Sequence, residues 1–202
     1  NNFFFYSFHF SIYCFCSIQK SSIPEGGIDH LGDIFLLAML DFLQGYQGRP
    51  EFRGKQAQLA HEILTSVQGR DENSASVTLA ASNTLLKIAK NPGIVTLVTK
   101  AFVDMLAKQS ESNIQLVLLG RLVDIRKHHR TIFEKHVKHL MSRIGSQSTD
   151  SFIEKVLELC LSSVGSNNVE HVIKSIEKEM TRRRGNNKAD AVQSRLAKAL
   201  HT

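Results

Sequence analysis

From about residue 30 onward, apolar residues recur every three to four positions, and short polar breaks separate the segments. This spacing is typical of amphipathic helices, and no convincing strand pattern interrupts it. Gly145, Gly165 and Gly185 stand just past the last apolar residue of their segments, where a left-handed helix end favours glycine. Pro92 can occupy a first helical turn. The pattern predicts helices over residues 31–43, 51–68, 74–89, 94–108, 113–127, 131–144, 149–164, 169–184 and 188–201.

These segments repeat as pairs. In the first helix of three successive pairs, Leu85, Leu122 and Leu159 are 37 residues apart. The second helices repeat an apolar register at spacings of 35 and 36 residues: Val98, Phe102 and Met105; Phe133, Val137, Leu140 and Ile144; Val169, Ile173, Ile176 and Met180. Helix pairs that recur at this period predict an all-α fold, a HEAT- or armadillo-like α-solenoid of antiparallel helix pairs.

The segment 113–127 is apolar on more than one side, which a helix at the surface of a protein does not need. A helix stacked in a solenoid packs against its partner and against both neighbouring pairs, so this pattern predicts a core helix. We expect Gly120 to allow a neighbouring backbone to come close, at a cost of roughly 1 kcal/mol relative to alanine. The predicted faces are Ile114, Val117, Leu118, Leu122 and Ile125, and Leu116, Leu119 and Val123.

Positive charge is concentrated in the second half of the chain. Residues 1–120 hold nine Lys and Arg against ten Asp and Glu, whereas residues 121–202 hold sixteen against nine. An acidic protein, an anionic membrane surface or nucleic acid would each suit this charge. The basic residues Lys174, Lys178 and Arg182–Arg184 follow one predicted helix to its end, where cations complement the helix dipole. They lack interleaved aromatic residues, so we favour a protein or membrane partner and expect no nucleic acid.

The first thirty residues differ from the rest. Residues 3–18, FFFYSFHFSIYCFCSI, carry no charge and lack the basic start of a signal peptide. They fall short of the roughly 20 residues that span a bilayer. A membrane-interacting segment, a terminal element on the core and sequence outside the domain all remain open. We therefore divide the chain into an apolar segment of uncertain order, 1–30, and a trunk fragment of about four helix pairs, 31–202. Because the sequence starts with Asn, we expect a longer parent chain.

Candidate reactive groups are scattered. The stretch KHHRTIFEKHVKHL contains four histidines, His128, His129, His136 and His139. The apolar residues between them are predicted to form the buried face of the helix, and no Cys or Asp completes a metal-ligand set. A basic, solvated helix flank is the favoured interpretation. Three cysteines are too few for a disulfide framework and indicate a reducing, intracellular setting.

Cys14 and Cys16 have no second pair, Cys160 sits on an apolar face, and Asp71–Glu72 fall in a polar break. No phosphate-binding loop, dinucleotide fingerprint or nucleophile elbow occurs. We expect no catalytic, cofactor-binding or metal-binding residue and no cofactor, so the chain is predicted not to be an enzyme. An active site in another part of a longer parent chain remains open.

Two stretches carry a family resemblance. KQSESNIQLVLLGRLVDIRKHH (108–129) and FIEKVLELCLSSVGSNNVEHVIKSIEKEM (152–180) resemble the trunk of beta-type large subunits of coatomer, the COPI vesicle coat. The likeness extends more weakly to SVTLAASNTLLKIAKNP (76–92) and covers residues 74–202. Gly120 stands where the family pattern has an acidic residue, and residues 1–30 resemble nothing in that trunk.

The resemblance implies a non-catalytic scaffold within the adaptin and coatomer large-subunit family. It implies binding to other coat subunits, namely the longin-like domain of a delta-type subunit and the gamma and zeta subunits. It also implies recruitment by an Arf-type small GTPase and a cytoplasmic, peripheral location on Golgi and COPI-coated vesicle membranes. No single partner-binding residue carries over. The alternatives are a large subunit of a clathrin-type adaptor, another HEAT-repeat scaffold and a basic helical nucleic-acid-binding protein.

Overall fold

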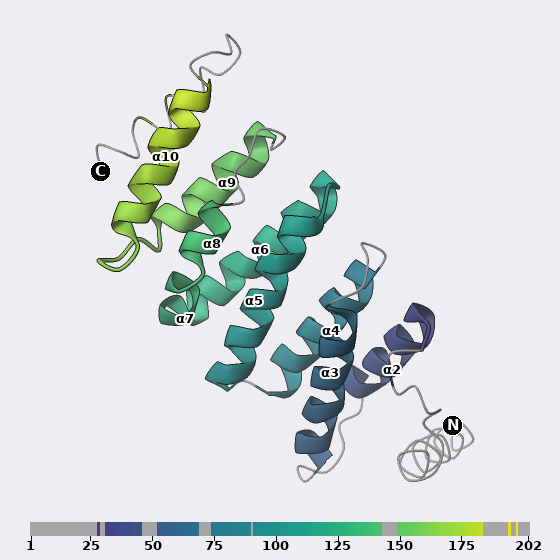
Figure 1. The fold of residues 1–202 in the computed structure, drawn as a ribbon. Coiled ribbons are helices and arrows are strands. Elements are labelled where there is room, and N and C mark those ends of the chain that lie inside the picture. The colour runs from purple at the N-terminus through teal and green to yellow at the C-terminus, as the bar shows by residue number, and fades with distance from the viewer. Residues whose placement is uncertain are drawn as a thin grey trace, which may run out of the picture. The chain divides into compact units, whose positions relative to one another are not determined.

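The computed structural model describes residues 28, 31–45, 52–68, 74–89, 91–142, 149–183, 194 and 197. Every regular element within these residues is a helix (Figure 1), which confirms the predicted all-α class. The elements are α2 (Asp33–Gly45), α3 (Arg53–Val67), α4 (Ala75–Ile88), α5 (Pro92–Lys108), α6 (Ser112–His128), α7 (Arg130–Glu134), α8 (Val137–Met141), α9 (Asp150–Leu161) and α10 (Val169–Arg183). The predicted helix 188–201 lies outside the described residues except at positions 194 and 197.

The chain divides into two compact units, residues 1–84 and 85–202, and α4 runs across the boundary. In the first unit α2 packs against α3. The side chain of Gln44, near the end of α2, donates a hydrogen bond from Nε2 to Oγ1 of Thr84 at 2.7 Å. Thr84 is fully buried in α4, so this bond joins α2 to α4.

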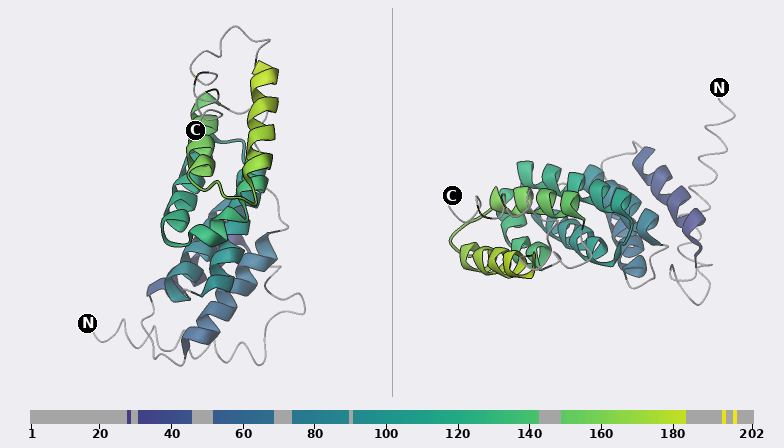
Figure 2. Two further views of the ribbon diagram at one scale, coloured as in Figure 1. Left: turned by 90° about the vertical axis from the view of Figure 1, so that its left-hand side faces the viewer. Right: turned by 90° about the horizontal axis from the view of Figure 1, so that it is seen from above.

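In the second unit the helices form two layers. Helix α5 contacts α7, and α8 contacts α10, while α6 contacts α9. Helix α6 also packs against α5 and α7, and α9 packs against α8. Short turns reverse the chain between α5 and α6 and between α6 and α7, so α5, α7–α8 and α10 form one layer and α6 and α9 the other (Figures 1 and 2). These are the antiparallel pairs that a HEAT- or armadillo-like stack requires.

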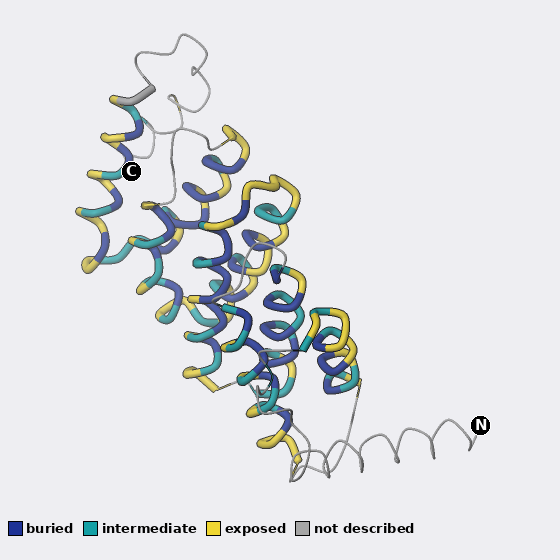
Figure 3. The backbone as a smooth tube through the Cα atoms, turned by 45° about the vertical axis from the view of Figure 1, so that its right-hand side comes forward, coloured by how far each residue is buried: buried dark blue, intermediate teal, exposed yellow. Residues whose placement is uncertain are grey.

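The repeated apolar positions lie in the core. Leu85, Leu122 and Leu159 are at most 2% exposed. Phe102, Phe133, Val137 and Leu140 are fully buried in the layer of second helices. Within each unit the buried residues line the sides of the helices that face one another (Figure 3). The predicted register is therefore confirmed for the first helices and for the second helices α5 and α7–α8, except that Ile144 lies outside the described residues.

Helix α10 departs from the predicted register. Val169 and Ile173 are 39% and 40% exposed, whereas Val172, Ile176 and Glu179 are buried. The prediction placed Val169 and Ile173 in the core because they align with Phe133 and Val137 of the preceding pair. Helix α10 packs against α8 on one side and is the last helix that the structure describes, so half of its apolar stripe has no described helix against it.

Helix α6 confirms part of the prediction for residues 113–127. Leu118, Leu119, Leu122 and Ile125 are buried between the neighbouring helices. Val117, however, is 48% exposed, so its assignment to the buried face is wrong. The close approach expected at Gly120 is also wrong, because a Cβ added there meets no neighbouring atom within 4 Å. Val117 and Gly120 are three residues apart on α6 and both point to the solvent side.

The variant Gly120→Ala is therefore expected to stabilise the protein. Alanine restricts the unfolded chain and favours helix over glycine by about 1 kcal/mol, and open space at this position imposes no opposing cost. Urea unfolding followed by circular dichroism should show a higher midpoint with an unchanged slope. A lower midpoint would mean that a neighbouring group does approach Gly120 closely.

The segment predicted as one helix over 131–144 is broken. Helix α7 ends at Glu134 and α8 begins at Val137, with a turn at Lys135 and His136. The backbone N–H groups of Lys135 and His136 donate to carbonyls three residues back, at 3.3 and 2.8 Å. The break leaves the Glu134 carbonyl available, and Asn168 Nδ2 donates to it at 3.3 Å. A side chain 34 residues away thus provides the hydrogen bond that the Glu134 carbonyl lacks within the broken helix.

Helix starts agree with the sequence better than helix ends. The Asn91 side chain accepts a hydrogen bond from the Ile94 N–H, and Pro92 opens α5 as predicted. By contrast, α9 ends at Leu161 rather than beside Gly165, and Gly165 does not have a left-handed backbone. The hydroxyls of Ser162 and Ser163 bind the last carbonyls of α9 in place of a glycine cap. Gly145 and Gly185 lie outside the described residues.

Candidate interaction surface

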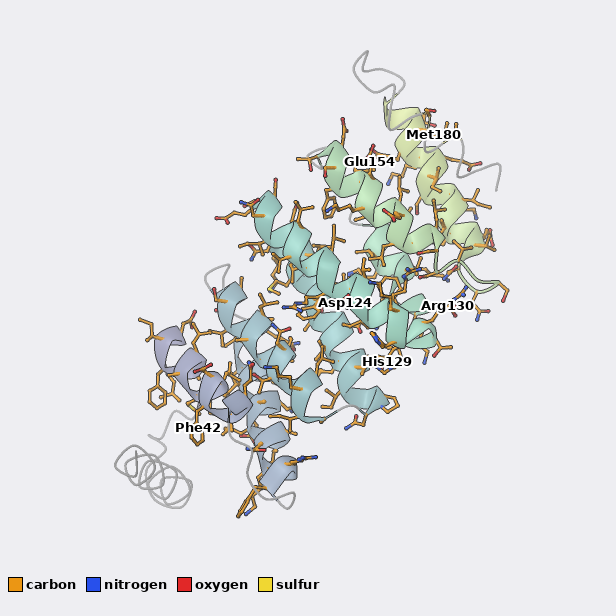
Figure 4. The ribbon with its side chains drawn as sticks, turned by 180° about the vertical axis from the view of Figure 1, so that it is seen from behind. Phe42, Asp124, His129, Arg130, Glu154 and Met180 are labelled. Atoms are coloured by element: carbon orange, nitrogen blue, oxygen red, sulfur yellow. The ribbon has the colours of Figure 1, made fainter. Side chains whose placement is uncertain are left out.

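The histidines of the polar cluster 127–140 occupy two separate places. His128 lies at the end of α6, where its Nδ1 is 2.9 Å from the Asp124 carbonyl oxygen. His129 occupies the turn to α7 and precedes Arg130, whose Nε donates to Glu134 at 3.1 Å (Figure 4). His136 and His139 belong to the α7–α8 segment. Among the described residues, no three His, Cys, Asp or Glu side chains are arranged to hold a metal ion.

A contact that is an ion pair when His139 is protonated connects the two second helices. His139 Nδ1 on α8 lies 3.8 Å from Asp104 Oδ1 on α5, and both side chains are slightly more than one-third exposed. Helices α5 and α7–α8 run in the same direction because α6 reverses the chain between them. One turn before Asp104 stands Lys100, and four residues before His139 stands Lys135. Both lysines lie close enough to His136 to act on its charge, and both are exposed.

The pKa of His136 depends on its burial and on these neighbouring charged groups. Burial lowers the pKa of His136 below its ordinary value of 6.5, and the neighbouring His139 lowers the pKa further. Asp104 opposes the shift, whereas Lys100 and Lys135 add to it. The Nε2 atom of His136 is buried without a hydrogen-bond partner. Protonation of His136 is therefore unfavourable in the folded protein.

The lowered pKa of His136 predicts a loss of stability in mild acid. As the pH falls below 6.5, the unfolded chain binds a proton at this residue before the folded chain does, so the free energy of unfolding decreases. The variant His136→Gln cannot take up that proton. Urea unfolding at about pH 7.5 and about pH 5.5 should show a smaller difference for the variant than for the wild type. Equal differences in both proteins would contradict the assignment to His136.

The remaining candidates do not form a reactive site. Burial raises the pKa of the Cys160 thiol far above its ordinary range, and the side chain is fully buried. Cys160 is thus a small core residue, as predicted. Lys174 pairs with Glu170 within α10, with Nζ 2.6 Å from Oε1. The side chains of Arg182–Arg184, together with Cys14, Cys16 and Asp71–Glu72, lie outside the part that the structure describes.

Charge differs between the two layers of the second unit. The described side chains of α5, α7–α8 and α10 include seven Lys and Arg against five Asp and Glu. Helices α6 and α9 hold four against four. The surplus of positive charge in the second half of the chain is thus confined, among these helices, to the layer of second helices. No helix within the described residues is long and apolar enough to cross a membrane.

Sequence reasoning missed the Lys100–Lys135 arrangement, although the repeat could have found it. The spacing of 35 residues that aligns Phe102 with Val137 also aligns Lys100 with Lys135 and Asp104 with His139. Positions that align in a stacked repeat lie side by side on neighbouring repeats. The histidines singled out from the sequence are close along the chain, whereas the lysines belong to two neighbouring repeats.

Comparison with known proteins identifies the family. Residues 12–202 match the family described as "Adaptin N terminal region". The chain is 25% identical over 170 residues to "Coatomer subunit beta" of Dictyostelium discoideum, which covers 79% of this chain and 18% of that protein. It is 29% identical over 168 residues to "Coatomer subunit beta" of Toxoplasma gondii, and the aligned part covers 81% of this chain and 15% of that protein. For the Rattus norvegicus protein of the same name, the identity is 24% over 181 residues, and the aligned part covers 87% of this chain and 18% of that protein.

The chain therefore spans less than one-fifth of the length of these curated relatives. The family match starts at residue 12, inside the segment that the sequence left unmatched, and continues to the last residue. It includes all of the second unit, the first unit from residue 12 onward and all of the described helices. The match covers far more than half of the sequence, and the described residues have the stacked helix pairs expected of such a trunk: this chain belongs to the adaptin N-terminal family.

Proposed function

We propose that this chain is part of the trunk of a beta-type large subunit of the COPI coat. The adaptin N-terminal family supplies non-catalytic scaffolds of vesicle coats, which sets the general function. The observation that carries the finer proposal is the set of relatives: similar proteins from an amoeba, an apicomplexan parasite and a mammal all bear the name coatomer subunit beta. The resemblance of residues 108–129 and 152–180 to that trunk points the same way.

A stack of helix pairs suits this role. Each pair presents side chains from two layers, and a folded partner can bind along several pairs through many modest contacts. In this proposal the chain binds other coat subunits, namely the longin-like domain of a delta-type subunit and the gamma and zeta subunits. An Arf-type GTPase recruits the assembly to the cytoplasmic side of Golgi membranes and COPI-coated vesicles. The division into residues 1–30 and a trunk fragment 31–202 remains part of the proposal.

Affinity purification of the full-length parent protein from its own cells, followed by mass spectrometry, tests this function. Recovery of delta-, gamma- and zeta-type coat subunits is the expected result. Recovery of a clathrin-adaptor set would keep the family and overturn the COPI assignment. Recovery of neither set would overturn the coat function itself.

A further inference from the structure

The exposed face of α5 and α7–α8 carries positive charge that no described carboxylate neutralises. Lys100 on α5 and Lys135 after α7 both lie close enough to His136 to act on its charge, and Lys138 follows three residues after Lys135. All three are exposed, and among the described residues none of them forms an ion pair. We call the surface around these three residues the lysine face.

Nearby carboxylates are already occupied. Asp104 pairs with His139, and Glu134 pairs with Arg130. Burial is the largest cause of the lowered pKa of His136, and the charges of His139, Lys100 and Lys135 add to it while Asp104 opposes it, so both lysines lie close enough to act on His136. Like charges held side by side without a counterion repel one another, so an anionic group that binds between them relieves repulsion as well as gaining attraction.

We propose that the lysine face is a docking surface for an acidic segment of a protein partner, with Lys100, Lys135 and Lys138 pairing with its carboxylates. The charge of the layer supports this choice, because the layer that contains the lysine face has an excess of Lys and Arg whereas the layer of α6 and α9 is balanced. Complementary charge of this kind gives specificity and fast association between proteins.

The composition of the face favours a protein over a membrane or nucleic acid. Helices that bind membrane surfaces insert large apolar side chains beside their cations. Among the described residues of the second unit, the large exposed apolar side chains are Val117 on α6 and Val169 and Ile173 on α10, so none lies on α5, α7 or α8. The aromatic residues of these helices, Phe102 and Phe133, are fully buried and cannot stack on bases. Half-exposed Asp104 would also repel a uniformly anionic surface, whereas a protein can place a cation opposite it.

This inference rests on the residues of the second unit and not on the COPI assignment. It holds for any acidic partner of an adaptin-family scaffold. Co-purification tests which coat the parent protein enters, and the binding experiment below tests which face of this chain accepts acidic groups. Each can fail while the other succeeds.

The test is binding of a fluorescently labelled oligoglutamate peptide to the full chain, followed by fluorescence anisotropy at low salt. The triple variant Lys100→Gln/Lys135→Gln/Lys138→Gln removes the lysine face. The matched control, Arg121→Gln/Lys127→Gln/Lys155→Gln, removes the same charge from exposed positions of α6 and α9. The triple variant should bind roughly tenfold more weakly than the wild type, as expected for the loss of three exposed ion pairs, and the control less than about twofold.

A second readout locates the peptide. Histidine titration by NMR should show that saturating oligoglutamate raises the pKa of His136, because bound carboxylates offset the charge of Lys100 and Lys135. Both variants should keep the helical circular dichroism and melting of the wild type, because all six replaced side chains are exposed.

Three results would overturn the proposal. The first is an equal loss of peptide binding in the triple variant and the control, which would mean that only net charge matters. The second is no measurable binding of the wild type to the peptide. The third is binding to phosphatidylcholine vesicles that contain phosphatidylserine, lost in the triple variant, without binding to the peptide. That result would identify a membrane surface instead.

Discussion

Leu122→Asp is expected to unfold the second unit. Leu122 is fully buried in α6, among residues of the helices on either side. Aspartate removes the apolar contacts of leucine and places a carboxylate at a position that is fully shielded from solvent. The expected cost is about 4 kcal/mol or more, a large share of the 5–15 kcal/mol that typically holds a domain folded. Circular dichroism should show less helix and no cooperative melting transition.

Val117→Asp is the matched control for this variant. It introduces the same side chain into the same helix, five residues earlier, but Val117 is 48% exposed. We expect its effect on the unfolding free energy to stay within about 1 kcal/mol, because its carboxylate remains hydrated. If both variants melted alike and near the wild-type temperature, the assignment of Leu122 to the core would be wrong. If both unfolded, α6 would be too sensitive to charge anywhere along its length for the comparison to report burial.

The success of the register prediction has a local cause. Helical spacing fixes which residues share one side of a helix, and a leucine-rich side must be buried in any stable stack. Leu85, Leu122 and Leu159 could therefore be assigned to the core from sequence alone, and each is buried. The pairing of helices followed from the same repeat, because short connections force consecutive helices to lie antiparallel.

The errors concern features that depend on what lies opposite a helix. Val117 belongs to an apolar run, yet no described helix covers its side of α6, and the sequence carries no sign of that difference. Gly120 had two opposite explanations, close packing and open space, and only the spatial neighbours decide between them. The same holds for α10, where the exposure of Val169 and Ile173 reflects the absence of a described helix beside them.

The candidate site shows a different limit. The sequence analysis considered residues that are close along the chain and therefore singled out the histidines near residue 130. The structure places these histidines at two separate positions. Lys100 and Lys135 are 35 residues apart, and both act on His136 because neighbouring repeats stack. A search for charges that recur at the repeat spacing would have found them. The lowered pKa of His136 depends on burial and could not have been predicted in that way.

The sequence did not predict the break between α7 and α8, and the side chain that binds the free carbonyl at this break leads to the second large effect. Asn168 is 4% exposed and lies just before α10. Its Nδ2 donates to the Glu134 carbonyl at 3.3 Å and to the Ser163 carbonyl at 3.2 Å, and its Oδ1 accepts from the Gly165 N–H at 2.9 Å. One side chain thus binds the broken second helix of one pair to the connection inside the next pair.

Asn168→Ala is expected to lower the unfolding free energy by about 2–3 kcal/mol. The variant loses three hydrogen bonds and leaves buried backbone groups without partners, which costs more than the bonds themselves contribute. Urea unfolding followed by circular dichroism measures this loss. Asn167→Ala is the control, because Asn167 is the adjacent residue and is exposed, and it should change the free energy by less than about 0.5 kcal/mol.

Asn168→Asp separates the two functions of the amide. Aspartate can still accept the Gly165 N–H, but it cannot donate, and it brings a carboxylate oxygen toward the carbonyls of Glu134 and Ser163. The free energy of unfolding of Asn168→Asp should therefore be as low as that of Asn168→Ala, or lower. If aspartate instead restored wild-type stability, the bond to Gly165 would be the important one, and the break between α7 and α8 would not depend on Asn168. Equal, small effects of Asn168→Ala and Asn167→Ala would show that water can replace the buried amide, and that the two helix pairs are held together by apolar packing alone.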